Sequence, residues 1–158
     1  MSNLEMRINA MCAVLVAETA EDRNKAVEDL KQAMAAKENK NDYVEGIIQD
    51  LFLEFGIPDH LKGYAYLVRA VQLAVENVKW VNNITFGLYP KLALEYETTP
   101  SRVERAIRNT ITGTFDRGNQ EMITNHFGSY INPDSGKVAN SEFIARMANL
   151  VKHRLRYM

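Results

Sequence analysis

Three arginines recur at intervals of three residues in a stretch with the pattern of an amphipathic helix. They are Arg102, Arg105 and Arg108, and an apolar stripe that includes Val103 and Ile107 lies on the opposite side. A guanidinium can donate two parallel hydrogen bonds to O6 and N7 of guanine, and it also binds phosphate. The helix dipole mildly disfavours cations in the first turn, so a need for solubility alone does not favour this placement. The pattern indicates a helix whose N-terminal half contacts base edges or phosphates.

The start of this helix can be predicted from its capping residues. Thr99 can accept a hydrogen bond from a first-turn N–H, and Pro100 suits the first helical position. Ser101 and Glu104 also fit a capping box, which leaves a second start position open. A plainer interpretation of Glu104 and Arg108 is a solvated ion pair one helical turn apart, contributing about 0.3–0.5 kcal/mol.

Charge is distributed unevenly along the 158 residues. The net charge is only -1. Residues 1–57 carry 11 acidic and 6 basic residues, whereas residues 58–158 carry 9 acidic and 13 basic residues. Only the second part therefore has the charge that favours binding to phosphates.

Several classes of protein are disfavoured by what the chain contains. The single cysteine, Cys12, cannot form an internal disulfide, and the histidines show no metal-ligand spacing. No apolar run approaches the length of roughly 20 residues that a membrane span needs, and no secretory signal pattern is present. No phosphate-binding glycine loop or nucleophile elbow is found. We therefore expect no enzyme, no metal, no cofactor, no small-molecule substrate and no membrane partner, and we expect a cytoplasmic location.

Hydrophobic periodicity predicts an all-α fold. The predicted helices cover about residues 4–18, 27–34, 43–55, 64–78, 84–96 with a break at Pro90, 100–115, 120–127 and 140 to the end. A polar turn is expected near residues 19–22, and the polar stretch 37–42 is interpreted as a linker. Residues 128–139 are expected to form a loop with at most a minor hairpin. Cys12, Met6, Met11 and Met34 are interpreted as core residues of the first helices.

The spacing of the elements matches a helix-turn-helix. A helix over 84–96, a short turn at Thr98 and Thr99, and the arginine helix have the required lengths. Lys62 precedes a predicted helix start, where it could contact a phosphate. The expected architecture is a bundle of about six helices over residues 41–158, preceded by one or two helices in residues 1–40.

Five separated motifs resemble the C-terminal effector domain of the sporulation stage-zero master regulator of endospore-forming bacteria. They occur in the family's order, from about residue 44 to the end, at residues 56–67, 88–90, 98–108, 117–119 and 140–145. The resemblance implies an all-helical domain whose third and fourth helices form the helix-turn-helix. It further implies that the helix over residues 100–115 enters the major groove of DNA.

The resemblance also implies roles for individual residues. Base edges or adjacent phosphates would be contacted by Arg102, Glu104, Arg105 and Arg108, with Arg105 and Arg108 the best candidates for guanine. Ser101 would bond a phosphate. At the position of Asn109 the family commonly has histidine, so a backbone contact could differ. With Lys62, the predicted DNA-binding residues are Ser101, Arg102, Glu104, Arg105, Arg108 and Asn109.

Two hypotheses for function follow. The first is a sequence-specific regulator of transcription that binds double-stranded DNA and whose N-terminal helices mediate a homodimer or cover the DNA-binding surface; RNA polymerase is a further expected partner. The second is a protein-protein interaction module that binds or sequesters a partner regulator without itself reading DNA. The family protein carries a phosphoacceptor receiver domain, and the roughly 43 residues ahead of the effector region are too few for its five-stranded sheet. We therefore expect no control by phosphorylation in cis.

Overall fold

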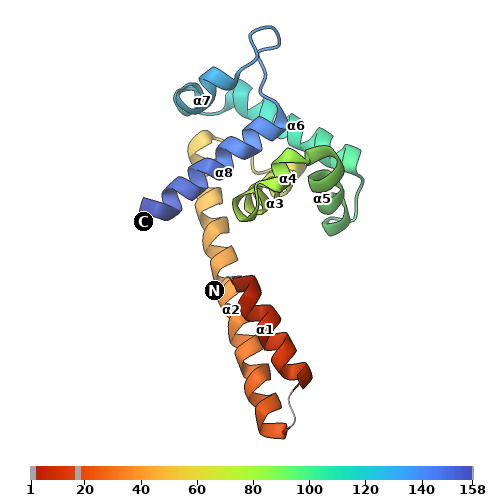
Figure 1. The fold of residues 1–158 in the computed structure, drawn as a ribbon. Coiled ribbons are helices and arrows are strands. Elements are labelled where there is room, and N and C mark those ends of the chain that lie inside the picture. The colour runs from red at the N-terminus through yellow and green to blue at the C-terminus, as the bar shows by residue number, and fades with distance from the viewer. Residues whose placement is uncertain (1–2, 17–18, 158) are drawn as a thin grey trace. The chain divides into compact units, whose positions relative to one another are not determined.

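The computed structural model describes residues 3–16 and 19–157, with side chains from Glu5 onward. Its helices are α1 (Asn3–Val16), α2 (Ala20–Phe55), α3 (Lys62–Glu76), α4 (Lys79–Asn82), α5 (Tyr89–Glu95), α6 (Pro100–Arg117), α7 (Gln120–Phe127) and α8 (Asn140–Tyr157). A π-helical turn, η1 (Ile84–Leu88), precedes α5, and a 3-10 turn, η2 (Gly128–Tyr130), follows α7. The described residues contain no strand, so the predicted all-α fold is confirmed and the minor hairpin considered for residues 128–139 is not formed (Figure 1).

Helix α2 corrects one prediction. Residues 37–42, interpreted as a linker, lie inside this continuous helix. The stretch is polar, but it contains no glycine or proline, and Lys37, Glu38 and Lys40 are good helix formers. A helix that is solvated on all sides needs no apolar periodicity, so the absence of periodicity did not indicate a break.

The chain folds into two compact units, residues 1–43 and 44–158, and α2 contributes to both. In the first unit, α1 and the first part of α2 form an antiparallel helical hairpin (Figure 1). The Thr19 hydroxyl accepts a hydrogen bond from the backbone N–H of Asp22 at 3.1 Å, so the predicted turn at 19–22 is instead the capped start of α2.

The interpretation of Cys12 and three methionines as core residues is wrong. Cys12 is exposed, and Met6, Met11 and Met34 are 45%, 54% and 52% exposed. The hairpin has a single seam, at which Ala26 is buried. Two helices that meet along one seam can cover only one face of each, so the other apolar residues stay in contact with solvent.

The core of the second unit is built from six helices, α2, α3, α5, α6, α7 and α8, and is rich in aromatic residues. Phe127 stacks on Phe143 with ring centroids 4.8 Å apart, and it meets Phe55 and Phe115 edge-on at 5.7 and 5.9 Å. The same hydrophobic core contains Val44, Ile47, Ile48, Leu51, Leu67, Val71, Ile144, Met147 and Val151, all of them buried. Offset and edge-on ring pairs stabilise a core beyond the area they bury.

Helix α2 ends at Phe55, at the position predicted, and Gly56 follows it. Gly56 has a φ of 69°, in the left-handed region that favours glycine. Its N–H donates to the Leu53 carbonyl at 3.0 Å, and the Ile57 N–H donates to the Phe52 carbonyl at 2.9 Å. These two bonds satisfy the last carbonyls of α2 and turn the chain toward α3.

Helix α3 packs on both α6 and α8 and holds α6 at close range. Gly63, in the first turn of α3, is buried against α6. A Cβ atom there would lie 2.1 Å from the Ala106 carbonyl oxygen and 2.3 Å from the Thr110 hydroxyl. Only glycine allows the two helices to approach this closely, so this contact sets the position of α6.

The remaining differences from prediction are local. The helix expected over residues 84–96 is not broken at Pro90, since the π-helical turn η1 ends at Leu88 and α5 follows directly at Tyr89, with Pro90 in its first turn. The short helix α4 was not predicted. Over the part of the chain that is described, no helix has the length and apolarity required to cross a membrane.

Candidate nucleic-acid interface

Residues 96–99 form the turn between α5 and α6. The Thr98 N–H donates to the Ala93 carbonyl at 2.9 Å across Glu97, whose φ is 51°. Thr99 is the N-cap of α6, and its hydroxyl accepts a bond from the Arg102 N–H at 3.4 Å. The first of the two predicted start positions is therefore confirmed, and α5, the turn and α6 form the predicted helix-turn-helix.

One side of α6 is fully engaged in the core. Its buried residues are Val103, Ile107, Thr110, Ile111, Gly113 and Thr114. The Thr110 hydroxyl donates to the Ala106 carbonyl at 3.0 Å, and the Thr114 hydroxyl donates to the Thr110 carbonyl at 2.8 Å. The buried hydroxyls are thus hydrogen-bonded, and α6 is held firmly from behind.

The opposite side of the N-terminal half of α6 is an open polar face. Ser101, Arg102, Arg105 and Asn109 are all exposed. Among the described residues, their side chains have no hydrogen-bond or ion-pair partner. By helical geometry Arg105 lies at the centre of this face, with Arg102 and Asn109 on one flank. These groups can bind an external ligand without breaking a contact within the protein.

Glu104 and Arg108 lie on the other flank and pair with each other. A terminal guanidinium nitrogen of Arg108 donates to Glu104 Oε1 at 2.6 Å. Both side chains are substantially exposed, at 42% for Glu104 and 63% for Arg108. The plainer interpretation of these two residues therefore describes the protein without DNA, and contact with a base would require the pair to rearrange.

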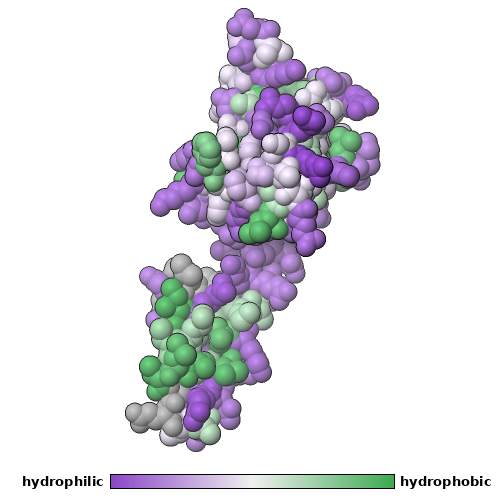
Figure 2. Space-filling model, turned by 90° about the vertical axis from the view of Figure 1, so that its right-hand side faces the viewer, coloured by the Kyte–Doolittle hydropathy of each residue, from purple (hydrophilic) through white to green (hydrophobic). Residues whose placement is uncertain are grey.

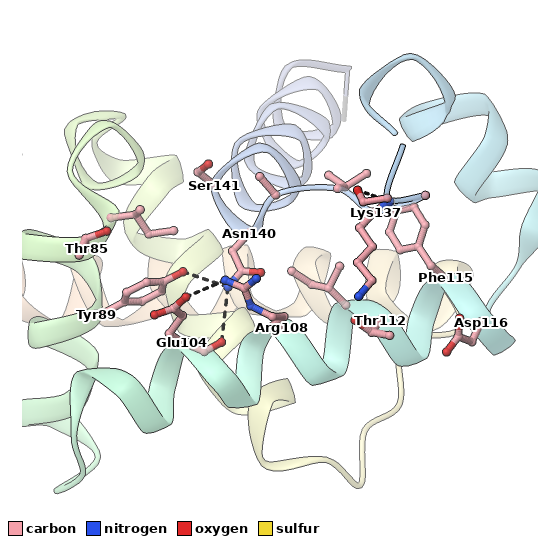
Figure 3. Close-up of a pocket in the computed structure, with 16 residues that line it drawn as sticks. Thr85, Tyr89, Glu104, Arg108, Thr112, Phe115, Asp116, Lys137, Asn140 and Ser141 are labelled. Atoms are coloured by element: carbon pink, nitrogen blue, oxygen red, sulfur yellow. Dashed lines mark hydrogen bonds and ion pairs between the residues drawn. The ribbon is translucent and has the colours of Figure 1, made fainter. Parts of the chain in front are cut away.

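A pocket of about 410 Å³ adjoins this flank of α6. It lies between α6, the η1–α5 segment, residues 135–139 and the start of α8, with Arg108 and Lys137 on its wall (Figure 3). At its base the buried Asn140 amide donates to the Tyr89 hydroxyl at 2.9 Å and to the Glu104 carbonyl at 3.4 Å. Burial raises the pKa of Tyr89, which keeps its hydroxyl protonated. Asn140 thus connects α8, α5 and α6 beside the N-terminal half of α6.

Replacing Asn140 by alanine should lower the free energy of unfolding by about 1–3 kcal/mol, because one buried and one partly buried acceptor lose their donor. Tyr89→Phe, which keeps the ring, serves as the partner mutation. Urea titrations of the wild type, both single variants and the double variant should give a coupling energy of about 0.5–1.5 kcal/mol. Additive effects of the two mutations would show that the hydrogen bond does not stabilise the fold.

An ion-pair cluster ties α5 to α3. The Arg69 guanidinium donates to the two Glu95 oxygens at 2.8 and 3.1 Å, and Lys91 Nζ lies 2.9 Å from Glu95 Oε1. The hydrogen bonds from Arg69 lower the pKa of Glu95, those from Lys91 add to the effect, and burial opposes it. This cluster braces the first helix of the helix-turn-helix against the core.

Glu95→Gln should destabilise the protein by about 1 kcal/mol at pH 7, a modest value because the cluster is partly exposed. A carboxylate with a depressed pKa stabilises the fold above its unfolded pKa of about 4.3, and this contribution is lost as the pH falls through the folded-state pKa. The difference in unfolding free energy between wild type and variant should therefore shrink between about pH 5 and pH 3. Glu97→Gln, in the adjacent turn, is the matched control. An equal pH dependence in both variants would contradict this account.

Lys62 lies on the far flank of the open face. It is the exposed first residue of α3, next to the contact of Gly63 with Ala106. Ala106 adjoins the flank of α6 that carries Arg102 and Asn109, so Lys62 borders that side. The predicted site residues therefore form one surface, which is centred on the N-terminal half of α6. Lys62 lies at one edge of this surface and the Glu104–Arg108 pair lies at the other.

Two residues near this surface were not predicted as part of it. Asn140 was predicted only as a helix start, and Lys137 was placed in a loop. Their role at the pocket depends on contacts between segments far apart in the sequence, for which the local pattern holds no signal.

Comparison with known families agrees with this arrangement. The family model described as "Sporulation initiation factor Spo0A C terminal" matches residues 48–151. The match covers α3 to α7 completely, together with the end of α2 and most of α8. This family consists of DNA-binding domains of transcription regulators and not of enzymes. With most of its length covered by this match, the chain belongs to the family of the C-terminal domain of the sporulation initiation factor Spo0A.

Proposed function

We propose that this domain regulates transcription by inserting the N-terminal half of α6 into the major groove of a specific DNA sequence. The observation that carries the proposal is the open face of Ser101, Arg102, Arg105 and Asn109 on a helix that is packed on its other side. Recognition helices contact base edges through their N-terminal residues. A fixed helix limits the loss of conformational freedom on binding to the side chains themselves.

The positions on this face suggest a division of roles. Arg105, at the centre, donates to O6 and N7 of a guanine. Arg108 reaches a second base or a nearby phosphate after its pair with Glu104 rearranges, and the freed Glu104 carboxylate accepts from a cytosine N4 amino group. Arg102 and Asn109 contact base edges or phosphates on the other flank.

Phosphate contacts fix the helix in the groove from both sides. Ser101 lies in the first turn of α6, where the positive end of the helix dipole favours an anion beside its hydroxyl. Lys62 on one side and Lys137 on the other are exposed cations at the two edges of the recognition surface. Such contacts set register and orientation, while the base contacts set specificity.

Selection of bound duplexes from a random pool by the full chain tests the proposal. A single guanine-containing motif should be enriched. Binding to it should weaken with salt, with a slope of log K against log salt concentration of about -3.6 to -5.4 for roughly four to six phosphate neutralisations. A pool that shows no enriched motif after repeated selection at moderate salt would refute sequence-specific recognition.

A further inference from the structure

The helical hairpin of residues 3–43 exposes an apolar surface on one side. On α1 this surface contains Ile8, Met11 and Leu15, which are 50%, 54% and 83% exposed. On α2 it contains Val27 and Met34, 37% and 52% exposed. Figure 2 shows hydrophobic side chains gathered into a patch on this unit. We call these five residues the hairpin face.

Helical geometry places the five residues on the same side of the hairpin. The seam between the helices is marked by the partly buried Val14 and Leu30 and the buried Ala26. At about 100° per residue, the stripe of α1 and that of α2 are each rotated from the seam by roughly a quarter turn. Because the two helices are antiparallel, equal rotations in the same sense point to one common side.

An exposed apolar surface of this kind is stabilised when a partner covers it. Isolated helices in water owe most of their stability to the packing of an apolar face, and the seam of two helices buries little. Clustered exposed apolar side chains on a soluble protein mark an interaction surface. Packing two such hairpins face to face would produce a four-helix bundle, which is a common way to bury stripes of this spacing.

The charges around the hairpin face favour a second copy of the same chain as the partner that covers it. Residues 1–43 carry eight acidic and six basic residues of mixed order, so two copies do not strongly repel each other. On α2, Lys31 and Glu38 are exposed and lie almost symmetrically before and after Met34. When two α2 helices cross in antiparallel orientation about a two-fold axis beside Met34, Lys31 of each copy faces Glu38 of the other. Such self-complementarity is what a two-fold interface requires.

We propose that the hairpin of residues 3–43 is a homodimerisation element, in which the hairpin faces of two chains pack into an antiparallel four-helix bundle. The proposal does not depend on how α6 reads DNA. It gives the exposed Met11, Met34 and Leu15 side chains a burial site that a single hairpin does not provide. Two DNA-binding domains joined in this way would bind adjacent sites with a gain in overall affinity.

Sedimentation equilibrium of the full chain tests this proposal. The wild type should be dimeric at micromolar concentrations, and Leu15→Glu should raise the dissociation constant of the dimer about 30-fold or more. Leu94→Glu is the matched control, because Leu94 of α5 is also 83% exposed but lies outside the hairpin. This control should remain dimeric. Circular dichroism of each variant verifies that the helices are retained.

A charge exchange tests the two-fold arrangement itself. Lys31→Glu should weaken the dimer several-fold, and adding Glu38→Lys in the same chain should restore it. A wild-type chain that stays monomeric at about 100 μM, or a Leu15→Glu variant that dimerises as tightly as the control, would overturn the proposal. If the chain is a monomer but still selects one DNA motif, the dimerisation proposal fails while the proposal of DNA recognition stands.

Discussion

Replacing Gly63 by alanine is expected to lower the free energy of unfolding by about 3 kcal/mol, with a fall in melting temperature of about 10 °C or more. The added methyl group would lie 2.1 Å from the Ala106 carbonyl oxygen, a backbone atom in the middle of α6. Neither helix can yield locally, because α3 also packs on α8 and α6 is buried along its whole inner side. The helices must separate, at the expense of the contacts around them.

Gly46 provides a control with the same substitution. It lies within α2, and a Cβ atom there would have no heavy atom within 4 Å. Gly46→Ala should therefore stabilise the protein by about 0.5–1 kcal/mol, since alanine restricts the unfolded chain and favours the helix. Urea or thermal unfolding of both variants should thus give effects of opposite sign. Equal effects would show that the close approach of α3 to α6 is not a tight constraint.

Arg105→Ala is expected to reduce affinity for the selected duplex by about 5- to 150-fold, equivalent to about 1–3 kcal/mol. Arg105 is at the centre of the open face and has no side-chain partner within the described part of the chain, so its removal should leave the fold unchanged. The loss should come with relaxed preference at a single base position. Affinity for random duplex should fall much less, because only one of several cationic contacts is removed.

Arg23→Ala is the matched control for this variant. It removes the same charge from an exposed position near the start of α2, outside the DNA-binding domain. Its affinity for the selected duplex should remain within about twofold of the wild type, since the variant removes no residue of the proposed recognition surface. Equal losses in both variants would indicate that net charge, and not base contact, explains the effect of Arg105.

The parts of the fold that follow from local signals could be predicted from the sequence. Thr99 and Pro100 define the start of α6, and Gly56 with Pro58 ends α2, because capping and left-handed turns depend on residues that are neighbours in the chain. The apolar stripe of α6 likewise follows from the helical repeat. These signals were sufficient to place the open polar face.

Features that depend on contacts between residues far apart in the sequence could not be predicted. The bond between Asn140 and Tyr89 joins residues 51 positions apart, and the close approach at Gly63 is visible only when α3 meets α6. Met11 and Met34 have the spacing of packed residues, yet the packing of α1 against α2 leaves both of them exposed. A pattern of apolar residues shows that a face needs burial, but it does not show whether the covering surface belongs to the same molecule.

The most direct test of the central claim is guanine methylation interference on the selected duplex, with wild type and Arg105→Ala side by side. Methylation at N7 blocks an acceptor that faces the major groove. We expect methylation of specific guanines to prevent binding of the wild type. For Arg105→Ala, methylation of one of these guanines should no longer affect binding. Interference that is absent, or that is identical for both proteins, would contradict recognition of the major groove by α6 through Arg105.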